Sequence, residues 1–258
     1  MNILFAASEC VPFAKTGGLA DVVGALPKQL AALGHHVVIV MPYYTSARTA
    51  IETLGLSSRR LDVQIALPLD NRTVPAALVE CQLPDSTARV ILIDIPEFFA
   101  RPELYGEGGR DYSDNAARFI LLNKAVFEAA RAIDFRPALL HVHDWQTALA
   151  TVLLKLTYGS DPFFSDCMSV LTIHNIAFQG LFWHYDWPML GLTWDHFNHN
   201  ELEMNQRISL LKGGIVFCDA MNTVSPTYAR DLLTVEGGMG MEVVLRVHQG
   251  KLKGILNG

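Results

Sequence analysis

The sequence has few cysteines, and none of them shows the spacing of a metal site. The four are Cys10, Cys81, Cys167 and Cys218. They stand far apart and form no CxxC pair, which argues against both a zinc site and a disulfide framework. No apolar run approaches the ~20 residues that cross a bilayer, and the N-terminus lacks the basic region of a signal peptide. We therefore expect a cytoplasmic protein without a membrane partner.

Positive charge is also scarce. The 258 residues carry a net charge of −6, and 18% of them are charged while 50% are hydrophobic. A chain of this composition can bury a large core and is not expected to be disordered. Arg59 and Arg60 form the only adjacent basic pair, whereas a nucleic-acid-binding protein typically shows a basic patch. The composition therefore disfavours nucleic acid as a partner and is compatible with an uncharged polymer such as a glucan.

The apolar pattern predicts an α/β fold. A continuous apolar run near the N-terminus is typical of a strand buried on both faces, and strands then alternate with segments of helical spacing. Such alternation predicts a Rossmann-like, doubly wound and mostly parallel sheet. The predicted strands cover residues 2–7, 36–41, 138–143, 169–174 and 219–223, and the predicted helices cover 19–33, 112–132, 145–157, 206–217 and 226–233.

A β-rich insertion interrupts this alternation at about residues 56–95. Segments near 62–67, 73–81 and 89–94 have strand character and are separated by turn residues. We interpret them as a β-hairpin followed by a strand that returns to the sheet. Ser113 is the expected N-cap of the helix that follows.

A glycine pair follows the first predicted strand. Lys15 precedes Gly17 and Gly18, which open a helix. Free N–H groups of a first helical turn, together with a lysine, can bind a phosphate. The segment is neither a Walker A loop nor the GxGxxG dinucleotide motif. A structural turn with a solvated lysine is the alternative, and the residues alone leave both open.

Two further polar clusters follow predicted strands, where ligands bind in doubly wound sheets. In His141-Val142-His143-Asp144-Trp145, the histidines share a strand face and could bind a metal, but no third ligand is evident. Asp144 and Trp145 better suit a sugar, since a carboxylate accepts from hydroxyls and an indole packs on a pyranose. Asp144 could instead cap the next helix. His174 and Asn175 end another strand before a loop rich in aromatic residues.

These segments together resemble the glycogen and starch synthases over nearly the whole chain. KTGGLADV near the N-terminus is the most specific of them. The matching segments are Lys15–Val22, His141–Trp145, Thr172–Asn175 with Phe178-Gln179-Gly180, Thr223–Ala229 and Leu256-Asn257-Gly258.

The resemblance implies a retaining glucosyltransferase of the architecture with two Rossmann-like domains. It implies transfer of glucose from ADP-glucose to the non-reducing end of an α-1,4-glucan such as glycogen or a maltooligosaccharide, with neither metal nor cofactor. The chain corresponds to the acceptor-side domain, residues 1–258. The C-terminal domain, which supplies most donor contacts in this family, is absent from it, so we expect little or no activity from this chain alone.

The resemblance also implies roles for individual residues. His174 and Asp144 are the expected catalytic residues, and Lys15, Gly17 and Gly18 would meet the diphosphate or glucosyl end of the donor. Residues expected to line the glucosyl and acceptor region, or the hinge in the case of Asn257, are Glu9, Trp145, Asn175, Tyr105 and Asn257. Gln146 stands where some relatives have histidine.

Two alternatives differ in kind from this enzyme. One is a glucan- or nucleotide-binding module without catalysis, which would bind maltoheptaose or ADP tightly by itself. The other is a nucleotide-sugar transferase of the same architecture, such as a sucrose-synthase-like enzyme, which a donor screen would distinguish. The KTGG segment disfavours this second alternative.

Overall fold

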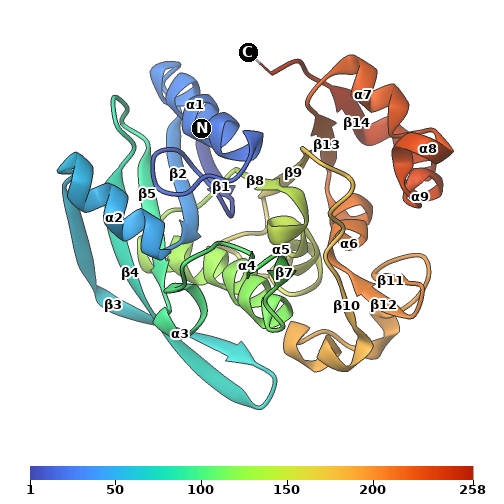
Figure 1. Cartoon of the computed structure of the whole chain (residues 1–258), viewed down its shortest axis with the longest axis horizontal. Coiled ribbons are helices and arrows are strands. Elements are labelled where there is room, and N and C mark those ends of the chain that lie inside the picture. The colour runs from blue at the N-terminus through green and yellow to red at the C-terminus, as the bar shows by residue number, and fades with distance from the viewer. Residues whose placement is uncertain (258) are drawn as a thin grey trace. The chain divides into compact units, whose positions relative to one another are not determined.

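The computed structural model describes residues 1–257, and its internal contacts divide the chain into two compact units. The N-terminal unit comprises Met1–Ala138, and the C-terminal unit comprises Leu139–Gly258. Figure 1 shows the first in blue to green and the second in yellow-green to red. Both units are built from strands that alternate with helices. No helix among residues 1–257 is long and apolar enough to cross a bilayer.

Three parallel strands form the centre of the N-terminal unit. β1 (Asn2–Ala6) pairs with β2 (His36–Pro42), which pairs in turn with β5 (Arg89–Asp94). β1 is almost entirely buried, as its continuous apolar run predicts. Helix α1 (Gly18–Ala32) connects β1 with β2 and buries Leu19 and Val23. The predicted βαβ unit is confirmed.

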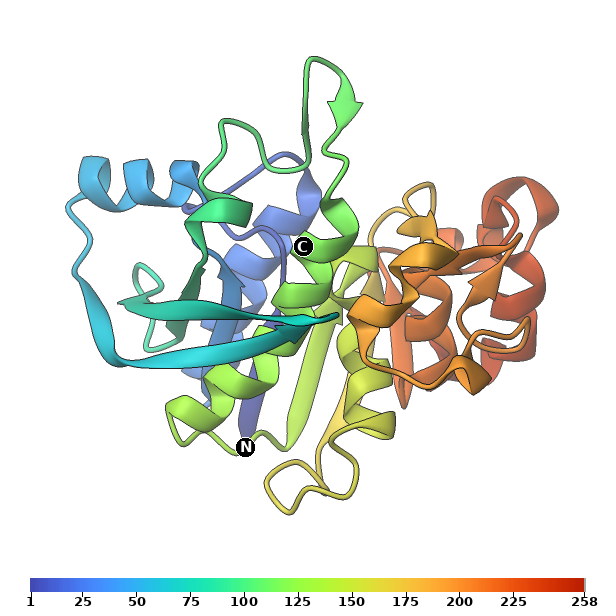
Figure 2. The same cartoon turned by 90° about the horizontal axis from the view of Figure 1, so that it is seen from below.

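The β-rich insertion is a long antiparallel hairpin. β3 (Ser58–Leu69) pairs with β4 (Arg72–Gln82), and Asp70 in the connecting turn has a φ of 53°. β4 pairs antiparallel with β5, so the order of strands in this unit is β1-β2-β5-β4-β3. Figure 2 shows the hairpin as two long teal arrows. The three predicted strands and the return of the third to the sheet are confirmed.

Helix α4 (Asn115–Ala132) begins later than its pattern predicts. Ser113 is not its N-cap. Asp114 occupies that position without a side-chain cap bond, since its carboxylate binds Arg101, with Oδ1 2.7 Å from Nη1. Four short elements had not been predicted, and each is too short or too polar to show a clear period: α2 (Thr45–Leu54), α3 (Pro96–Phe99), β6 (Gly106–Glu107) and β7 (Arg110–Asp111).

The C-terminal unit has four parallel strands in the order β8-β9-β13-β14. Helix α5 (Asp144–Leu156) follows β8, and α6 (Leu210–Phe217) precedes β13. The predicted alternation is therefore confirmed here as well. The bounds of the strands are β8 (Leu139–His143), β9 (Met168–Ile173), β13 (Ala220–Thr223) and β14 (Leu252–Gly254).

The helix predicted over 206–217 begins only at Leu210, so the prediction of a helix over residues 206–209 was wrong. Arg207–Ser209 form β12, which pairs with β10 (Leu181–Trp183) and β11 (Glu203–Met204). Asn205 and Gln206 have φ values of 52° and 62°, which suit the tight turn between β11 and β12. The Ser209 hydroxyl accepts from the amide of Lys212 and caps α6.

The remaining elements of the C-terminal unit are short. The helix predicted over 226–233 ends earlier, and two helices after it had not been predicted. The Ile255 amide donates to the Thr223 carbonyl at 2.8 Å, which holds the chain after β14 against the end of β13. The short elements of this unit are η1 (His184–Leu190), η2 (Trp194–His196), α7 (Pro226–Asp231), α8 (Val235–Gly238), α9 (Glu242–Val247) and η3 (Gln249–Lys251).

The close packing of α5 against α6 gives a stability prediction. A Cβ at Gly214 would lie 2.6 Å from the Cβ of Ala148 and 3.3 Å from a methyl group of Leu171. Alanine normally favours a helix over glycine by about 1 kcal/mol, but overpacking here costs about 1–3 kcal/mol. We expect Gly214→Ala to lower the free energy of unfolding in urea. Gly250→Ala, where a Cβ meets nothing within 4 Å, is the control, and equal stability of both variants would contradict this account of the packing.

Candidate functional site

Each unit carries a cluster of polar side chains just beyond the carboxyl ends of its parallel strands. In the N-terminal unit the cluster follows β1 and is centred on Glu9. In the C-terminal unit it follows β8 and β9 and is centred on Asp144 and His174. Carboxyl ends of strands are where doubly wound sheets bind their ligands.

The buried carboxylate of Glu9 organises the first cluster. Its Oε2 accepts from the amides of Thr16 at 2.5 Å and Gly17 at 3.2 Å. Its Oε1 accepts from the hydroxyls of Thr16 and Tyr105, each at 2.6 Å. The Ser8 hydroxyl lies 2.8 Å from the Tyr105 oxygen. Glu9 therefore fixes the loop between β1 and α1 by satisfying its backbone and hydroxyl donors.

Burial raises the pKa of Tyr105 well above its usual value, and the neighbouring Tyr44 and Glu9 raise it further. Tyr105 consequently stays protonated at neutral pH and donates to Glu9. Sequence reasoning placed Tyr105 at the acceptor site, and the structure brings it together with Glu9. The sequence analysis gave no role to Ser8 or Thr16, although both flank predicted site residues.

Lys15 lies at the surface of the same loop. Its Nζ is 2.7 and 2.8 Å from the two carboxylate oxygens of Asp21, and about half of each side chain is exposed. Exposed ion pairs of this kind contribute only ~0–1 kcal/mol, so a ligand anion could replace Asp21 at little cost. A Cβ at Gly17 or Gly18 would meet nothing within 4 Å. The glycine pair thus borders open space, although the Gly17 amide already donates to Glu9.

Asp144 joins the ends of two neighbouring strands. Its Oδ1 accepts from the amides of His174 at 2.7 Å and Asn175 at 3.3 Å. The residue adopts a φ of 52°, which is uncommon for a side chain other than glycine. The N-cap of α5 is His143, so the alternative that Asp144 caps this helix is wrong. Its carboxylate binds the end of β9 instead.

Three histidines lie in a row beside Asp144. The rings of His141 and His143 stack with centroids 4.4 Å apart, and those of His143 and His174 are 5.3 Å apart. Nδ1 of His143 lies 3.0 Å from Nε2 of His174. The Thr172 hydroxyl donates to Oδ1 of Asn222 at 2.5 Å, so its oxygen accepts from Nε2–H of His141 at 2.7 Å. This bond assigns the proton of neutral His141 to Nε2.

Burial keeps all three rings neutral at pH 7. It lowers the pKa of His174 to about 4 and, together with His174, that of His141 to about 3. The pKa of His143 lies well below its usual value because of burial and of both neighbours. The sequence analysis singled out His174, and it did not predict that His143 lies between His141 and His174.

The geometry gives no support to the metal alternative for the histidine pair. Nδ1 of His143 is turned toward Nε2 of His174 rather than toward a shared cation position. Within residues 1–257, no group of three or more His, Cys, Asp or Glu side chains is arranged to hold a metal ion.

Trp145 does not lie where a sugar could pack on its face. Its side chain is 8% exposed, and Phe182 lies beside it with ring centroids 5.6 Å apart. A Cβ at Gly180, which has a φ of 60°, would lie 2.7 Å from Cε3 of the indole. The predicted stacking role is therefore corrected: the ring packs against Gly180, and the glycine permits this approach. Gln146 is buried beside it in α5.

The two asparagines of the expected site are exposed. Oδ1 of Asn175 accepts from the Ala177 amide at 3.0 Å. The Asn257 amide donates to the Val224 carbonyl at 3.2 Å, while Gly258 lies outside the described residues. Tyr228 had no predicted role, yet its hydroxyl accepts from the Ile176 amide at 3.1 Å. Its place in the Thr223–Ala229 segment was the available signal.

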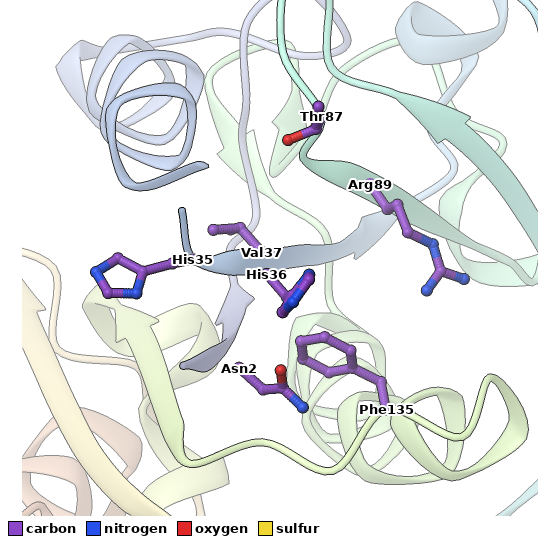
Figure 3. A pocket seen from close by; sticks show the side chains of 7 residues that line it. All are labelled: Asn2, His35, His36, Val37, Thr87, Arg89 and Phe135. Carbon is purple, nitrogen blue, oxygen red and sulfur yellow. The ribbon is translucent and has the colours of Figure 1, made fainter. Parts of the chain in front are cut away.

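A separate hollow of about 210 Å³ lies in the N-terminal unit. Figure 3 shows the rings of His36 and Phe135 beside Asn2, with Arg89 across from them. Asn2, His36 and Arg89 are the first residues of β1, β2 and β5. The hollow therefore lies at the amino ends of the strands, away from the Glu9 cluster at their carboxyl ends.

The fold and both clusters define a Rossmann-like α/β protein with its polar groups at the carboxyl ends of parallel strands. The family model of the starch synthase catalytic domain matches residues 2–247. The chain belongs to this family, and the resemblance to glycogen and starch synthases is confirmed.

Individual relatives agree with this assignment. Glycogen synthase of Koribacter versatilis is 43% identical over 258 residues, which cover 100% of this chain and 52% of that protein. Glycogen synthase 1 of Geobacter sulfurreducens is also 43% identical, with 51% of its length covered. The catalytic domain of starch synthase IV from Arabidopsis thaliana, bound to ADP and acarbose, superposes with a TM-score of 0.88 at 30% identity, over 99% of this chain and 51% of that one. The chain spans about half the length of these relatives.

The buried histidines predict a loss of stability in acid. An unfolded histidine titrates near its ordinary pKa of about 6.5, whereas folded His174 and His141 titrate at about 4 and 3. The unfolded chain therefore binds more protons between these values, and the free energy of unfolding falls as the pH is lowered from 6.5 to 4.5. Each histidine that stays neutral contributes roughly 1.4 kcal/mol per pH unit.

Urea unfolding at a series of pH values measures this slope. We expect His174→Gln to reduce it by about one proton. The control, His36→Gln at an exposed position, should leave the slope unchanged. A slope in His174→Gln equal to that of the wild type would show that this ring is not held neutral.

Proposed function

We propose that this chain is the acceptor-side part of a retaining glucosyltransferase that moves glucose from ADP-glucose to the non-reducing end of an α-1,4-glucan. The match of the starch synthase catalytic domain over residues 2–247 carries this proposal. The names of the glycogen synthase relatives support the glucan as product, and the ADP and acarbose bound to the Arabidopsis structure support the nucleotide and the sugar.

In this proposal the loop after β1 receives the phosphate end of the donor. Lys15 is exposed and forms an ion pair with the surface carboxylate of Asp21, and it would exchange this partner for the diphosphate. Gly17 and Gly18 leave open space beside the backbone at the start of α1, where N–H groups favour an anion. Glu9 holds the loop in this shape through Thr16 and Gly17.

The ends of β8 and β9 receive the transferred glucose. Asp144 fixes the backbone at His174 and Asn175, which sets the direction of the His174 carbonyl and ring. Because His174 is neutral at pH 7, it contributes hydrogen bonds and not a positive charge. Asn175 is exposed beside it and would bind sugar hydroxyls.

The reaction exchanges one bond of the glucosyl carbon for another. Its bond to the β-phosphate oxygen of ADP breaks, a bond to the 4-hydroxyl oxygen of the glucan forms on the same face, and the hydroxyl proton leaves with ADP. Lys15 stabilises the negative charge of the departing diphosphate. Since the chain spans about half the length of its relatives, the proposal assigns the remaining donor contacts to a C-terminal domain of the complete protein, with Asn257 at the hinge.

Lys15 is tested in the complete protein by transfer from ADP-glucose to glycogen. Loss of one group that stabilises a developing charge typically costs about 10²–10³ in rate, so we expect Lys15→Ala to lower kcat by that factor. Lys28→Ala, in helix α1 that follows the loop, is the control. Activity of Lys15→Ala equal to the control would remove Lys15 from the site, and better use of UDP-glucose would overturn the assigned donor. The 258-residue chain alone should show no robust turnover.

The positioning role of Asp144 gives a separate kinetic expectation. Asp144→Ala removes the acceptor of two amides, and displacement of reacting groups by about 1 Å can cost about 10²-fold. Asp144→Asn keeps an oxygen at the same place, and we expect it to stay within about tenfold of wild type. The loss should appear in kcat more than in KM for glycogen. Equal losses in both variants would indicate that the charge acts directly on the substrate.

A further inference from the structure

Arg118 holds its charged side chain in the interior of the N-terminal unit. The residue lies on α4 and is fully buried. Its Nε–H donates to the Phe98 carbonyl and its Nη1–H to Oδ1 of Asn115, each at 2.7 Å. Its Nη2 is also buried, and it has no hydrogen-bond partner among residues 1–257. Both acceptors of this guanidinium are neutral groups, so they leave its charge uncompensated.

The carboxylates near Arg118 are bound by other groups. Both oxygens of Asp114 accept from Arg101, with Oδ1 2.7 Å from Nη1. Arg101 and Arg118 lie over the same Tyr112 ring, with Cζ 4.6 and 4.9 Å from its centroid. Glu9 accepts from two amides and two hydroxyls, and Arg118 is not one of these donors. Around the Tyr112 ring, two guanidiniums therefore accompany one carboxylate, and that carboxylate pairs with Arg101.

Two tyrosine hydroxyls near Arg118 are buried as well. The hydroxyl oxygens of Tyr44 and Tyr112 have no hydrogen-bond partner in the part of the chain that the structure describes. Phe99 joins Tyr44 to Arg118, since its ring centroid is 5.8 Å from that of Tyr44 and 5.5 Å from Cζ of Arg118. Tyr44 precedes α2, Phe99 ends α3 and Arg118 lies on α4 (Figure 1). Burial raises the pKa of Tyr44 well above its usual value, so this tyrosine is a neutral donor and not the missing negative charge.

Water could satisfy these donors but could not neutralise the charge. A buried ion is costly unless an opposite charge compensates it. Burial lowers the pKa of Arg118, yet a guanidinium keeps its proton in proteins. The faces of Phe99, Tyr112 and Phe119 attract the cation but carry no net charge. An anion that accepts from Nη2–H and from the two hydroxyls would satisfy both the hydrogen bonds and the charge.

The enclosure selects a small anion. Nη2 of Arg118 and the hydroxyl oxygens of Tyr44 and Tyr112 each expose less than 1 Å² to solvent. A phosphate or sulfate has four oxygens that need donors, and it would have to displace these packed rings. A halide ion needs only a few N–H and O–H donors around one atom.

We propose that Arg118, Tyr44 and Tyr112 form a buried anion site that holds chloride. Nη2–H of Arg118 and the two hydroxyls donate to the ion. No substrate enters the site, so it stands or fails independently of the proposed function.

The proposed ion is linked to the Glu9 cluster through α4. Asn115, which accepts from Arg118, donates from Nδ2 to the Tyr105 carbonyl at 2.8 Å. The Tyr105 hydroxyl donates in turn to Glu9. An anion that fixes Arg118 therefore also stabilises the backbone position of Tyr105, and its first effect is on the stability of the N-terminal unit.

Thermal unfolding of the 258-residue chain in sodium chloride and in sodium gluconate of equal ionic strength tests the site. An ion that binds only the folded state raises Tm, and at about five times its Kd we expect a rise of about 2–4 °C. Arg118→Met should abolish the difference between the two salts. Tyr44→Phe removes one hydroxyl and keeps the ring, and it should raise the Kd for chloride about three- to tenfold. Tyr43→Phe, at the neighbouring and less buried position, is the matched control and should respond as the wild type does.

Bromide locates the ion without any variant, which keeps the test decisive if Arg118→Met does not fold. Crystals of the wild type grown in sodium bromide should show an anomalous peak within hydrogen-bonding distance of Nη2 of Arg118. Peaks confined to exposed basic side chains would mean an adventitious ion only and would overturn the site. Water at this position, equal Tm values of the wild type in both salts, or an undiminished chloride effect in Tyr44→Phe would overturn it too.

Discussion

The hydrogen bond from the Asp144 carboxylate to the His174 amide is the constraint on which the C-terminal cluster depends. It joins the ends of β8 and β9, and Asp144 has a left-handed backbone conformation at the start of α5. Such conformations persist where the surroundings hold them, and they are concentrated at functional sites. The same carboxylate oxygen also accepts from the Asn175 amide, so one side chain holds the backbone of the two residues that follow β9.

Glu9 performs the same task in the N-terminal unit. A buried carboxylate is costly unless donors satisfy it, and here two amides and two hydroxyls do so. The Glu9 carboxylate thereby holds the loop that carries Lys15, while the Lys15 side chain stays exposed. In both units a buried carboxylate orders the backbone, and the groups offered to a ligand lie on the surface that it shapes.

The elements with a strong period could be predicted from the sequence, and the contacts between distant residues could not. The run at residues 2–7 and the hairpin strands are found where the pattern places them. Ser113 is not the cap because α4 begins at Asn115, which makes Asp114 the N-cap residue. The carboxylate of Asp114 binds Arg101, which lies 13 residues earlier, and no local pattern records that partner. The sequence predicts that Trp145 meets a sugar, but its indole is buried against Gly180. Gly180 lies 35 residues later in the chain, so no local pattern reveals this contact. The motifs predict the site residues, whereas the contacts of Glu9 with Tyr105 and of His143 with His174 join residues far apart in the sequence.

The neutral histidines limit what the C-terminal cluster can do. Desolvation keeps His141, His143 and His174 uncharged at physiological pH, so this cluster supplies hydrogen bonds of fixed direction and no cation. Departure of a nucleoside diphosphate needs positive charge in a site with little water. In the proposed reaction that charge falls to Lys15 in this chain and to groups outside it. The division is physically consistent, because a protonated histidine beside the glucosyl carbon would oppose the positive charge that develops there as its bond to phosphate breaks.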